Sequence, residues 1–205
     1  MNIEKNTRKI SIRTIEDFNS LDYEKVMYPV IMYGKEKIDN NMYDDWDEYK
    51  HTRKMIEGLK KNFQDNQDIK IDIYCIEDNN LVIGVCFYIF GEDYMKSFIE
   101  KIEGKDDKTI NKSAQLTCFH ILKKYRGIGT RWLKEVIFPD LIKSNIQNLY
   151  VKSSHNRALH TYQRLGKQIG QYIGISDNEL YQRLGHIYMI KTEAINNKKS
   201  IYTKF

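Results

Sequence analysis

The residues best suited to chemistry form one short segment, Lys123 to Thr130, in which two glycines stand among basic side chains. Gly127 and Gly129 allow the main chain to approach a ligand without interference from a Cβ atom. A helix that starts near Thr130 directs several free N–H groups and its positive end at the same place. Such an arrangement suits a pyrophosphate, although the spacing alone fits an ordinary strand-to-helix turn equally well.

Positive charge is concentrated around this segment. The whole chain has 33 Lys and Arg against 28 Asp and Glu, a net charge of +5. Between Thr117 and Lys167 there are ten basic residues and only two acidic ones, so this stretch is more positive than the chain as a whole. A nucleic-acid-binding protein has only this basic stretch in its favour, and phosphates of a small ligand explain it as well.

Two other phosphate-binding motifs are excluded by their missing residues. No Gly-Lys-Ser or Gly-Lys-Thr triplet is present, which excludes a P-loop nucleotide hydrolase. Trp132 stands three residues after Gly129, where a dinucleotide-binding fingerprint has its last glycine.

The elements that position this segment follow from apolar periodicity. We predict strands at 10–14, 70–76, 81–90, 115–122, 149–153, 171–175 and 186–191, and helices at 15–27, 44–63, 92–103, 130–144 and 157–165. Residues 77–80 predict a hairpin turn, and Pro139 predicts a kink in the helix that follows the glycine segment. This order favours an α/β or α+β layered domain around one sheet.

Composition limits the class of protein. The 205 residues fit a single domain, which we place at 1–195, with a helical insertion at 92–112 and a polar tail at 196–205. Three cysteines argue against a disulfide scaffold and for a reducing compartment. No apolar run reaches the length of a membrane helix, and the charged start is unlike a secretory signal. We therefore expect a cytoplasmic protein that binds neither membrane nor nucleic acid.

Two blocks together resemble a known family. The sequence Lys124-Tyr125-Arg126-Gly127-Ile128-Gly129 after a strand resembles the acetyl-CoA loop of the GCN5-related N-acetyltransferase (GNAT) family. About 30 residues later, Leu149-Tyr150-Val151 and the run from Asn156 to Gly166 resemble the second CoA-contacting block of that family. The resemblance implies an acyl-CoA N-acyltransferase fold, with a central mixed and mostly antiparallel sheet flanked by helices.

The resemblance also implies an activity and a set of site residues. The activity would be direct transfer of an acetyl group from acetyl-CoA to a small-molecule or peptide amine, with no metal, and a homodimer is in keeping with the family. Tyr162 would protonate the departing CoA thiolate. The residues expected at the CoA are Phe119, Ile121, Lys124, Arg126, Gly127, Ile128, Gly129, Thr130 and Asn156, although the family's asparagine position falls on His155.

The general base is not identified by the sequence. Residues 113–117, where some family members carry a carboxylate, contain none, so the base could be a carboxylate elsewhere, a histidine or water. By alternation, Gln115, Thr117, Phe119 and Ile121 share one face of their strand. Cys118 and His120 then lie on the other face, where we expect them to be core residues.

Two readings stay open. The acidic and aromatic run at 43–49 is either a substrate-recognition segment or a helix start rich in acids. The missing carboxylate favours, as the alternative to an enzyme, a catalytically degenerate CoA-binding or protein-interaction module.

Overall fold

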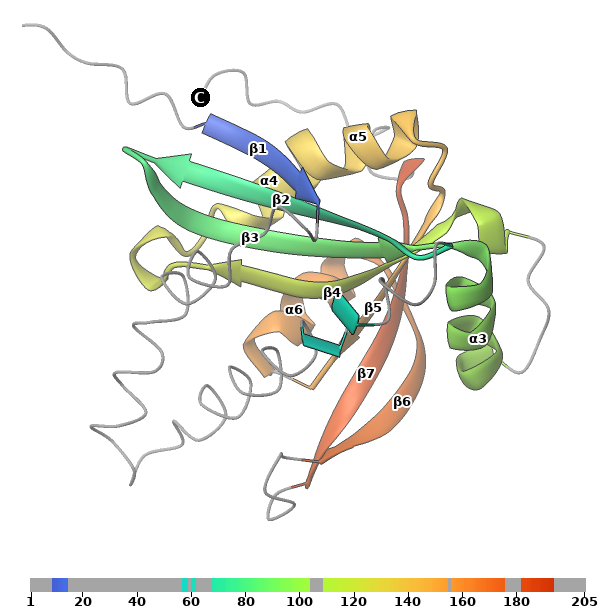
Figure 1. Cartoon of the computed structure of the whole chain (residues 1–205). Coiled ribbons are helices and arrows are strands. Elements are labelled where there is room, and N and C mark those ends of the chain that lie inside the picture. The colour runs from blue at the N-terminus through green and yellow to red at the C-terminus, as the bar shows by residue number, and fades with distance from the viewer. Residues whose placement is uncertain are drawn as a thin grey trace, which may run out of the picture.

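The computed structural model describes residues 9–14, 57–58, 60–61, 68–103, 109–154, 156–175 and 182–193. These residues form a seven-stranded sheet in the order β1-β2-β3-β4-β5-β7-β6 (Figure 1). The strands are β1 (Lys9–Thr14), β2 (Lys70–Asp78), β3 (Leu81–Phe90), β4 (Ser113–Ile121), β5 (Asn148–Ser153), β6 (Lys167–Ile175) and β7 (Gln182–Lys191). Every neighbouring pair is antiparallel except β4 and β5, which confirms the mixed, mostly antiparallel sheet expected from the sequence.

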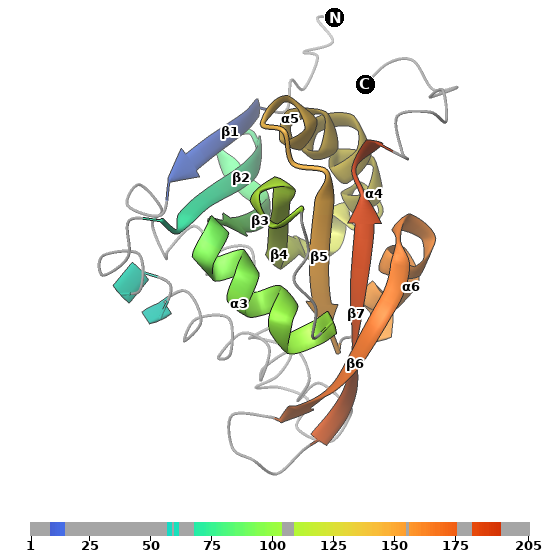
Figure 2. The same cartoon turned by 90° about the vertical axis from the view of Figure 1, so that its right-hand side faces the viewer.

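The helices cover both sides of the sheet. They are α3 (Glu92–Glu103), α4 (Gly129–Trp132), α5 (Phe138–Lys143) and α6 (Asn156–Leu165), and a π-helical turn, Leu133–Ile137, joins α4 to α5. Helix α3 lies on one side of the sheet, and α4 and α5 lie on the other (Figure 2). We call these sides the α3 face and the α4–α6 face, because buried residues of α6 pack in the same core cluster as those of α4 and α5.

Two local predictions can be compared with the structure directly. The hairpin between β2 and β3 is confirmed: Asn79 and Asn80 have φ angles of 51° and 62°, as a tight turn of this kind requires. The helix after the glycine segment is irregular at Leu133–Ile137, just before the predicted kink at Pro139. Pro139 has no N–H and its ring crowds the preceding turn, and the wider π-helical turn accommodates both.

The large core cluster lies on the α4–α6 face. Its members come from the strands, from α4, the π-helical turn and α5 (Trp132, Leu133 and Phe138, in that order), and from α6 (Tyr162, Leu165). A second, smaller cluster on the α3 face joins Met95 and Ile99 to Tyr150. No helix within the described ranges is both long and apolar enough to cross a membrane.

Several predicted segments fall wholly or mainly outside the described residues. They are the helix at 15–27, the acidic run at 43–49, the tail from 196 and most of the helix at 44–63, of which Glu57, Gly58, Lys60 and Lys61 are described and helical. Strand β6 begins at Lys167 and β7 at Gln182, earlier than predicted, because their first residues are polar and gave no strand pattern.

Candidate functional site

The glycine segment is the turn between β4 and α4. Leu122 donates its N–H to the Ile83 carbonyl at 2.7 Å, which fixes the end of β4, and a 3₁₀ turn follows. Gly127 has a φ of 104°, a conformation that favours glycine, and a Cβ there would meet open space. The first helical bond runs from the Trp132 N–H to the Ile128 carbonyl at 2.9 Å. The amides just before Trp132 therefore have no acceptor within their own helix.

Gly129 lets this turn sit directly on β4. A Cβ at Gly129 would lie 3.0 Å from the ring of Phe119 and 3.5 Å from Ile121. The Phe119 ring also stacks on Trp132 with 5.7 Å between the ring centroids. The side chains of Phe119 and Ile121 therefore pack beneath the first turn of α4. This packing leaves the main chain of Phe119 and Ile121 as the part of these residues that a ligand could reach most directly.

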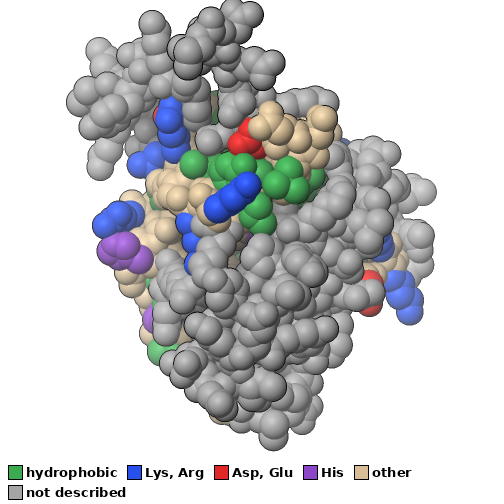
Figure 3. Space-filling view, turned by 90° about the vertical axis from the view of Figure 1, so that its left-hand side faces the viewer, with side chains coloured by type: hydrophobic (Ala, Val, Ile, Leu, Met, Phe, Trp, Pro, Cys, Tyr) green, Lys and Arg blue, Asp and Glu red, His purple; other side chains and the backbone are tan. Residues whose placement is uncertain are grey.

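The charged side chains of the segment are distributed unequally. Lys124 and Arg126 are exposed, and the Lys124 Nζ lies 4.8 Å from the centroid of the Tyr125 ring. Arg131 pairs with Glu135 at 3.0 Å, so part of its charge is compensated. Ile128 and Thr130 are partly buried. Figure 3 views this end of the molecule and shows Lys and Arg side chains on its described surface.

A β-bulge in β4 corrects one sequence prediction. Phe87 pairs with Cys118 while the next residue of β3, Tyr88, pairs with Leu116, so Thr117 is an extra residue in β4. The extra residue reverses the alternation: Leu116 lies on the same face as Phe119 and Ile121, opposite Tyr88 of the core. The prediction that Gln115 shares a face with Phe119 and Ile121 was therefore wrong.

The bulge also lies where the two parallel strands cease to pair. The ladder joins Ser113–Leu116 to Asn148–Val151, and within the described chain no later pair connects β4 to β5. Beyond Thr117, the edge of β4 that faces away from β3 therefore forms no ladder with β5 in the described chain. This part of β4 leads directly into the glycine turn.

Tyr162 lies on the buried side of α6. The side chain is 5% exposed and belongs to the main core cluster. Its ring lies 6.1 Å from the ring of Tyr188 on β7, centroid to centroid. Asn156 is the first residue of α6, and its side chain and all of His155 lie outside the described residues.

Three residues that sequence reasoning missed share this region with Tyr162. In the described part of the chain, no hydrogen-bond partner is found for the buried Tyr188 hydroxyl, the Trp132 Nε1 or the His186 Nδ1. The Tyr88 hydroxyl likewise has no oxygen or nitrogen partner and lies beside the Cys86 thiol; burial, first of all, raises its pKa well above the ordinary value. An unsatisfied buried polar atom costs about 1–3 kcal/mol. Several such polar atoms lie on the α4–α6 face. A polar ligand bound there would supply the hydrogen bonds that they lack.

A sequence signal for these residues exists but is weak. Tyr188 and His186 share a face by alternation along β7, and Tyr88 is two residues from Cys86 on β3. The pairing of β7 with β5 brings Tyr188 near Tyr162. No sequence pattern predicts that pairing.

His120 and Cys118 were predicted to be core residues. Cys118 is buried, as expected. His120 is on the face opposite Ile121, as expected, but it is partly exposed and has an interaction partner. Its side of the sheet is the α3 face.

Two further described carboxylates, Asp72 and Asp140, lie on β2 and α5. The Tyr74 hydroxyl donates to the Asp140 Oδ2 at 2.5 Å and ties α5 to β2. Burial, followed by the charge of Asp140, raises the pKa of Asp72 on the same strand. The Tyr74–Asp140 bond thus holds the helix on the sheet, while Asp72 and Asp140 repel one another. No three His, Cys, Asp or Glu side chains in the described ranges are grouped as a metal site.

The comparisons with known proteins concern the fold. The sequence matches no family profile and no curated protein. A probable acetyltransferase from Staphylococcus epidermidis superposes with a TM-score of 0.52 at 17% identity, over 88% of this chain and 99% of its own. A chimeric spermidine N-acetyltransferase from Vibrio cholerae and hSSAT superposes with a TM-score of 0.50 at 15% identity, over 92% and 99% of the two chains. The described sheet and helices therefore have the GNAT acyl-CoA N-acyltransferase fold.

Proposed function

We propose that the protein is an N-acetyltransferase that moves an acetyl group from acetyl-CoA to a primary amine by direct transfer. The observation that carries this proposal is the coincidence of two features at one end of β4. The β4–β5 ladder ends at the Thr117 bulge, and the same strand runs into the Gly127–Gly129 turn at the start of α4. One feature offers main-chain groups to an extended arm, and the other offers amides to phosphates.

Two parts of the chain would bind two parts of acetyl-CoA. The amides from Arg126 to Thr130, with the exposed charges of Lys124 and Arg126, hold the pyrophosphate. The main chain of β4 beside Phe119 and Ile121 holds the pantetheine arm by hydrogen bonds, since those side chains are already packed under α4. Acetyl-CoA supplies the activated acyl group as a thioester.

Tyr162 supplies the proton for the leaving thiolate. A thiol has a pKa near 8.5, so its thiolate is a mild base for which a phenol is an adequate donor. Tyr162 belongs to α6, and its ring lies against the ring of Tyr188 on β7, which limits the rotation of the Tyr162 ring. The hydroxyls of Tyr88 and Tyr188, for which the described residues supply no oxygen or nitrogen partner, offer further hydrogen bonds in the same buried region.

Thermal unfolding with and without acetyl-CoA at fixed salt tests the proposal. At about 100 times the Kd, binding stabilises the folded state by roughly 2.7 kcal/mol, a rise in Tm of about 5–11 °C for a chain of this size. Gly127→Asp places a negative charge at the phosphates and a side chain where φ is 104°, so it should abolish the rise. Gly58→Asp, at an exposed helical glycine with open space around it, is the matched control. No rise in the unmodified protein at millimolar acetyl-CoA would refute the proposed site.

The alternative, a CoA-binding or interaction module without catalysis, is favoured by one observation. Residues 113–117 contain no carboxylate, and the Gln115 side chain there accepts a bond from the Tyr94 hydroxyl at 2.5 Å. A rise in Tm with acetyl-CoA, but no release of free CoA with any amine in a broad panel, would select this alternative.

A further inference from the structure

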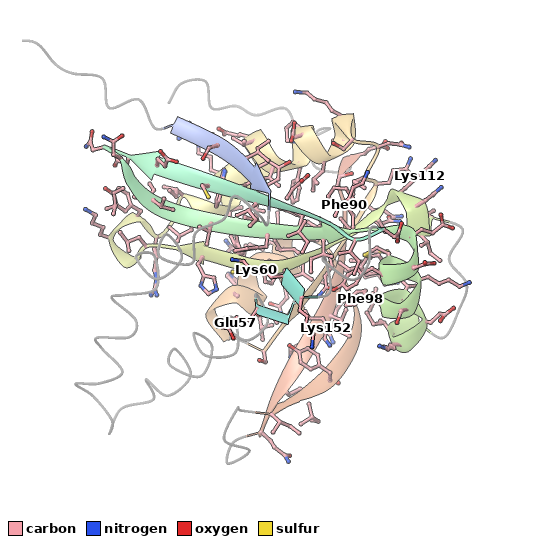
Figure 4. The ribbon with its side chains drawn as sticks, viewed as in Figure 1. Glu57, Lys60, Phe90, Phe98, Lys112 and Lys152 are labelled. Atoms are coloured by element: carbon pink, nitrogen blue, oxygen red, sulfur yellow. The ribbon has the colours of Figure 1, made fainter. Side chains whose placement is uncertain are left out.

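A basic and aromatic cluster lies on the α3 face, outside the site described above. Lys152 follows Val151, the last β5 residue that pairs with β4, and it projects to the same side as Tyr150. Its Nζ lies 4.5 Å from the centroid of the Tyr172 ring on β6. Lys152 is exposed enough to meet a ligand. Figure 4 shows Lys152 and Phe98 in the region between α3 and the β6–β7 pair.

A glycine on the intervening strand makes this contact possible. Strand β7 lies between β5 and β6, and Gly185 on β7 pairs directly with Tyr172. A Cβ at Gly185 would overlap the Tyr172 ring. The ring therefore lies flat across β7 and reaches Lys152, which pairs with Ile187 on the other side of β7. Any other residue at position 185 would close this space.

Helix α3 forms the remaining wall and adds a second positive charge. Phe98 packs against Tyr150 with ring centroids 5.9 Å apart, and Ile102 lies over Gly170 of β6. Lys101, between them, is exposed. Partial burial, first, and the charge of Lys101, second, lower the pKa of Lys152. Neither lysine forms an ion pair with a carboxylate of the described residues, so two positive charges face one another across this surface.

The position of the cluster relates it to the proposed reaction. On the α4–α6 face next to β4 and β5, the proposed CoA site lies against Trp132, Leu133, Tyr162 and other core side chains. An amine that attacks a thioester held at the end of the β4–β5 ladder must therefore approach from the α3 face. Lys152 stands on that face, one residue beyond the end of the ladder.

We propose that Lys152 and Lys101, with the Tyr172 ring, form an anion subsite that binds a carboxylate of the acceptor amine. This inference rests on the proposed function and narrows its substrate class. The acceptor would be an amino acid or a short acidic peptide. A polyamine is disfavoured, because two lysines that pair with no carboxylate of the described residues repel additional cations.

The experiment compares acceptors that differ only in this charge. The substrates are glycine, β-alanine and 4-aminobutyrate, each paired with its amide, and free CoA release gives kcat/KM. The spacer series locates the carboxylate relative to the amine. For each pair, kcat/KM for the acid is divided by kcat/KM for the amide. Comparing this acid-to-amide ratio between variants cancels the different intrinsic reactivities of the amines. In Lys152→Gln, which loses one charged partner, the acid-to-amide ratio of kcat/KM should fall about tenfold for the acceptor with the best spacer length. Lys152→Arg should retain the ratio of the unmodified protein. Lys96→Gln, on the other flank of α3, is the charge-matched control and should leave the ratio unchanged.

A binding measurement separates this inference from the proposed function. Isothermal titration with the N-acetylated acids and amides, in the absence of CoA, should show weaker binding of the acid, but not of the amide, in Lys152→Gln. Equal binding of acid and amide by the unmodified protein, or an unchanged preference in Lys152→Gln, would overturn the subsite. If acetyl-CoA gives no thermal stabilisation but the acid still binds through Lys152, the subsite stands and the proposed acetyl transfer fails.

Discussion

The turn after α6 offers a sharp test of how the Tyr162 helix is held. Gly166 donates its N–H to the Tyr162 carbonyl at 2.9 Å and thereby ends α6. A Cβ at Gly166 would lie 2.5 Å from the main-chain oxygen of Met189 and 2.7 Å from Ile190 Cγ1. The obstructing atoms include the backbone of β7, which cannot turn aside as a flexible side chain can. In Gly166→Ala, α6 and β7 must therefore separate.

The size of the effect follows from those distances. A carbon atom essentially never comes within 3.0 Å of such a neighbour, so β7 and the turn must move apart by at least 0.5 Å. That movement loosens the contact between Tyr162 and Tyr188 in a fully packed core. Overpacking of this kind costs about 2–3 kcal/mol, which lowers the Tm by roughly 4–12 °C for a chain of this length.

Urea unfolding followed by circular dichroism, together with the thermal midpoint, measures this cost. Gly58→Ala is the control, because its new methyl group meets nothing within 4 Å on an exposed helix. We expect that control to be neutral or more stable by up to about 1 kcal/mol. A Gly166→Ala protein as stable as the Gly58→Ala protein would show that α6 and β7 are not packed as closely as described.

Two further predictions concern single side chains. Tyr162→Phe should lower the turnover number by about 100-fold or more with little change in the Kd for CoA, as measured by steady-state kinetics and calorimetry; equal turnover would remove the role of Tyr162 as proton donor. Asp72→Asn should raise the free energy of unfolding at pH 7, since the folded protein holds a proton on Asp72 more tightly than the unfolded chain does. Ionised Asp72 therefore costs stability above its unfolded pKa of about 3.9, and the gain in Asp72→Asn should vanish as the pH falls below about 4. Urea unfolding at several pH values checks it, and a gain that persists at pH 3 would contradict it.

The sequence predicted those parts of the fold that depend on local pattern. The strands at 81–90 and 149–153 and the existence of the hairpin were predicted correctly, because alternation, β-branched residues and turn residues act over a few positions. The turn was predicted at 77–80, but β2 runs to Asp78 and only Asn79 and Asn80 form the turn. The glycine turn was predicted because the lack of a Cβ at Gly127 and Gly129 is a property of the residues themselves.

What the sequence could not predict depends on partners far away in the chain. The sequence of β4 does not reveal the bulge at Thr117, because its mixed polar and apolar residues are compatible with either face of the sheet. Only the pairing with β3 determines which residues face the core. Gly185 resembles any strand glycine until Tyr172 is placed opposite to it. Tyr188 becomes part of the site only through the β5–β7 pairing, which joins segments separated by helix α6 and strand β6.

The order β5-β7-β6 also dictates when the site can assemble. Within the described sheet, β6 pairs only with β7, so it cannot join the earlier strands when it leaves the ribosome. It must wait until β7 has been synthesised as far as Lys191, and the two strands then dock on β5 through β7. Tyr162 consequently has no Tyr188 neighbour during most of translation. On the proposed function, the nascent chain should begin to bind CoA tightly only when its last described strand has emerged.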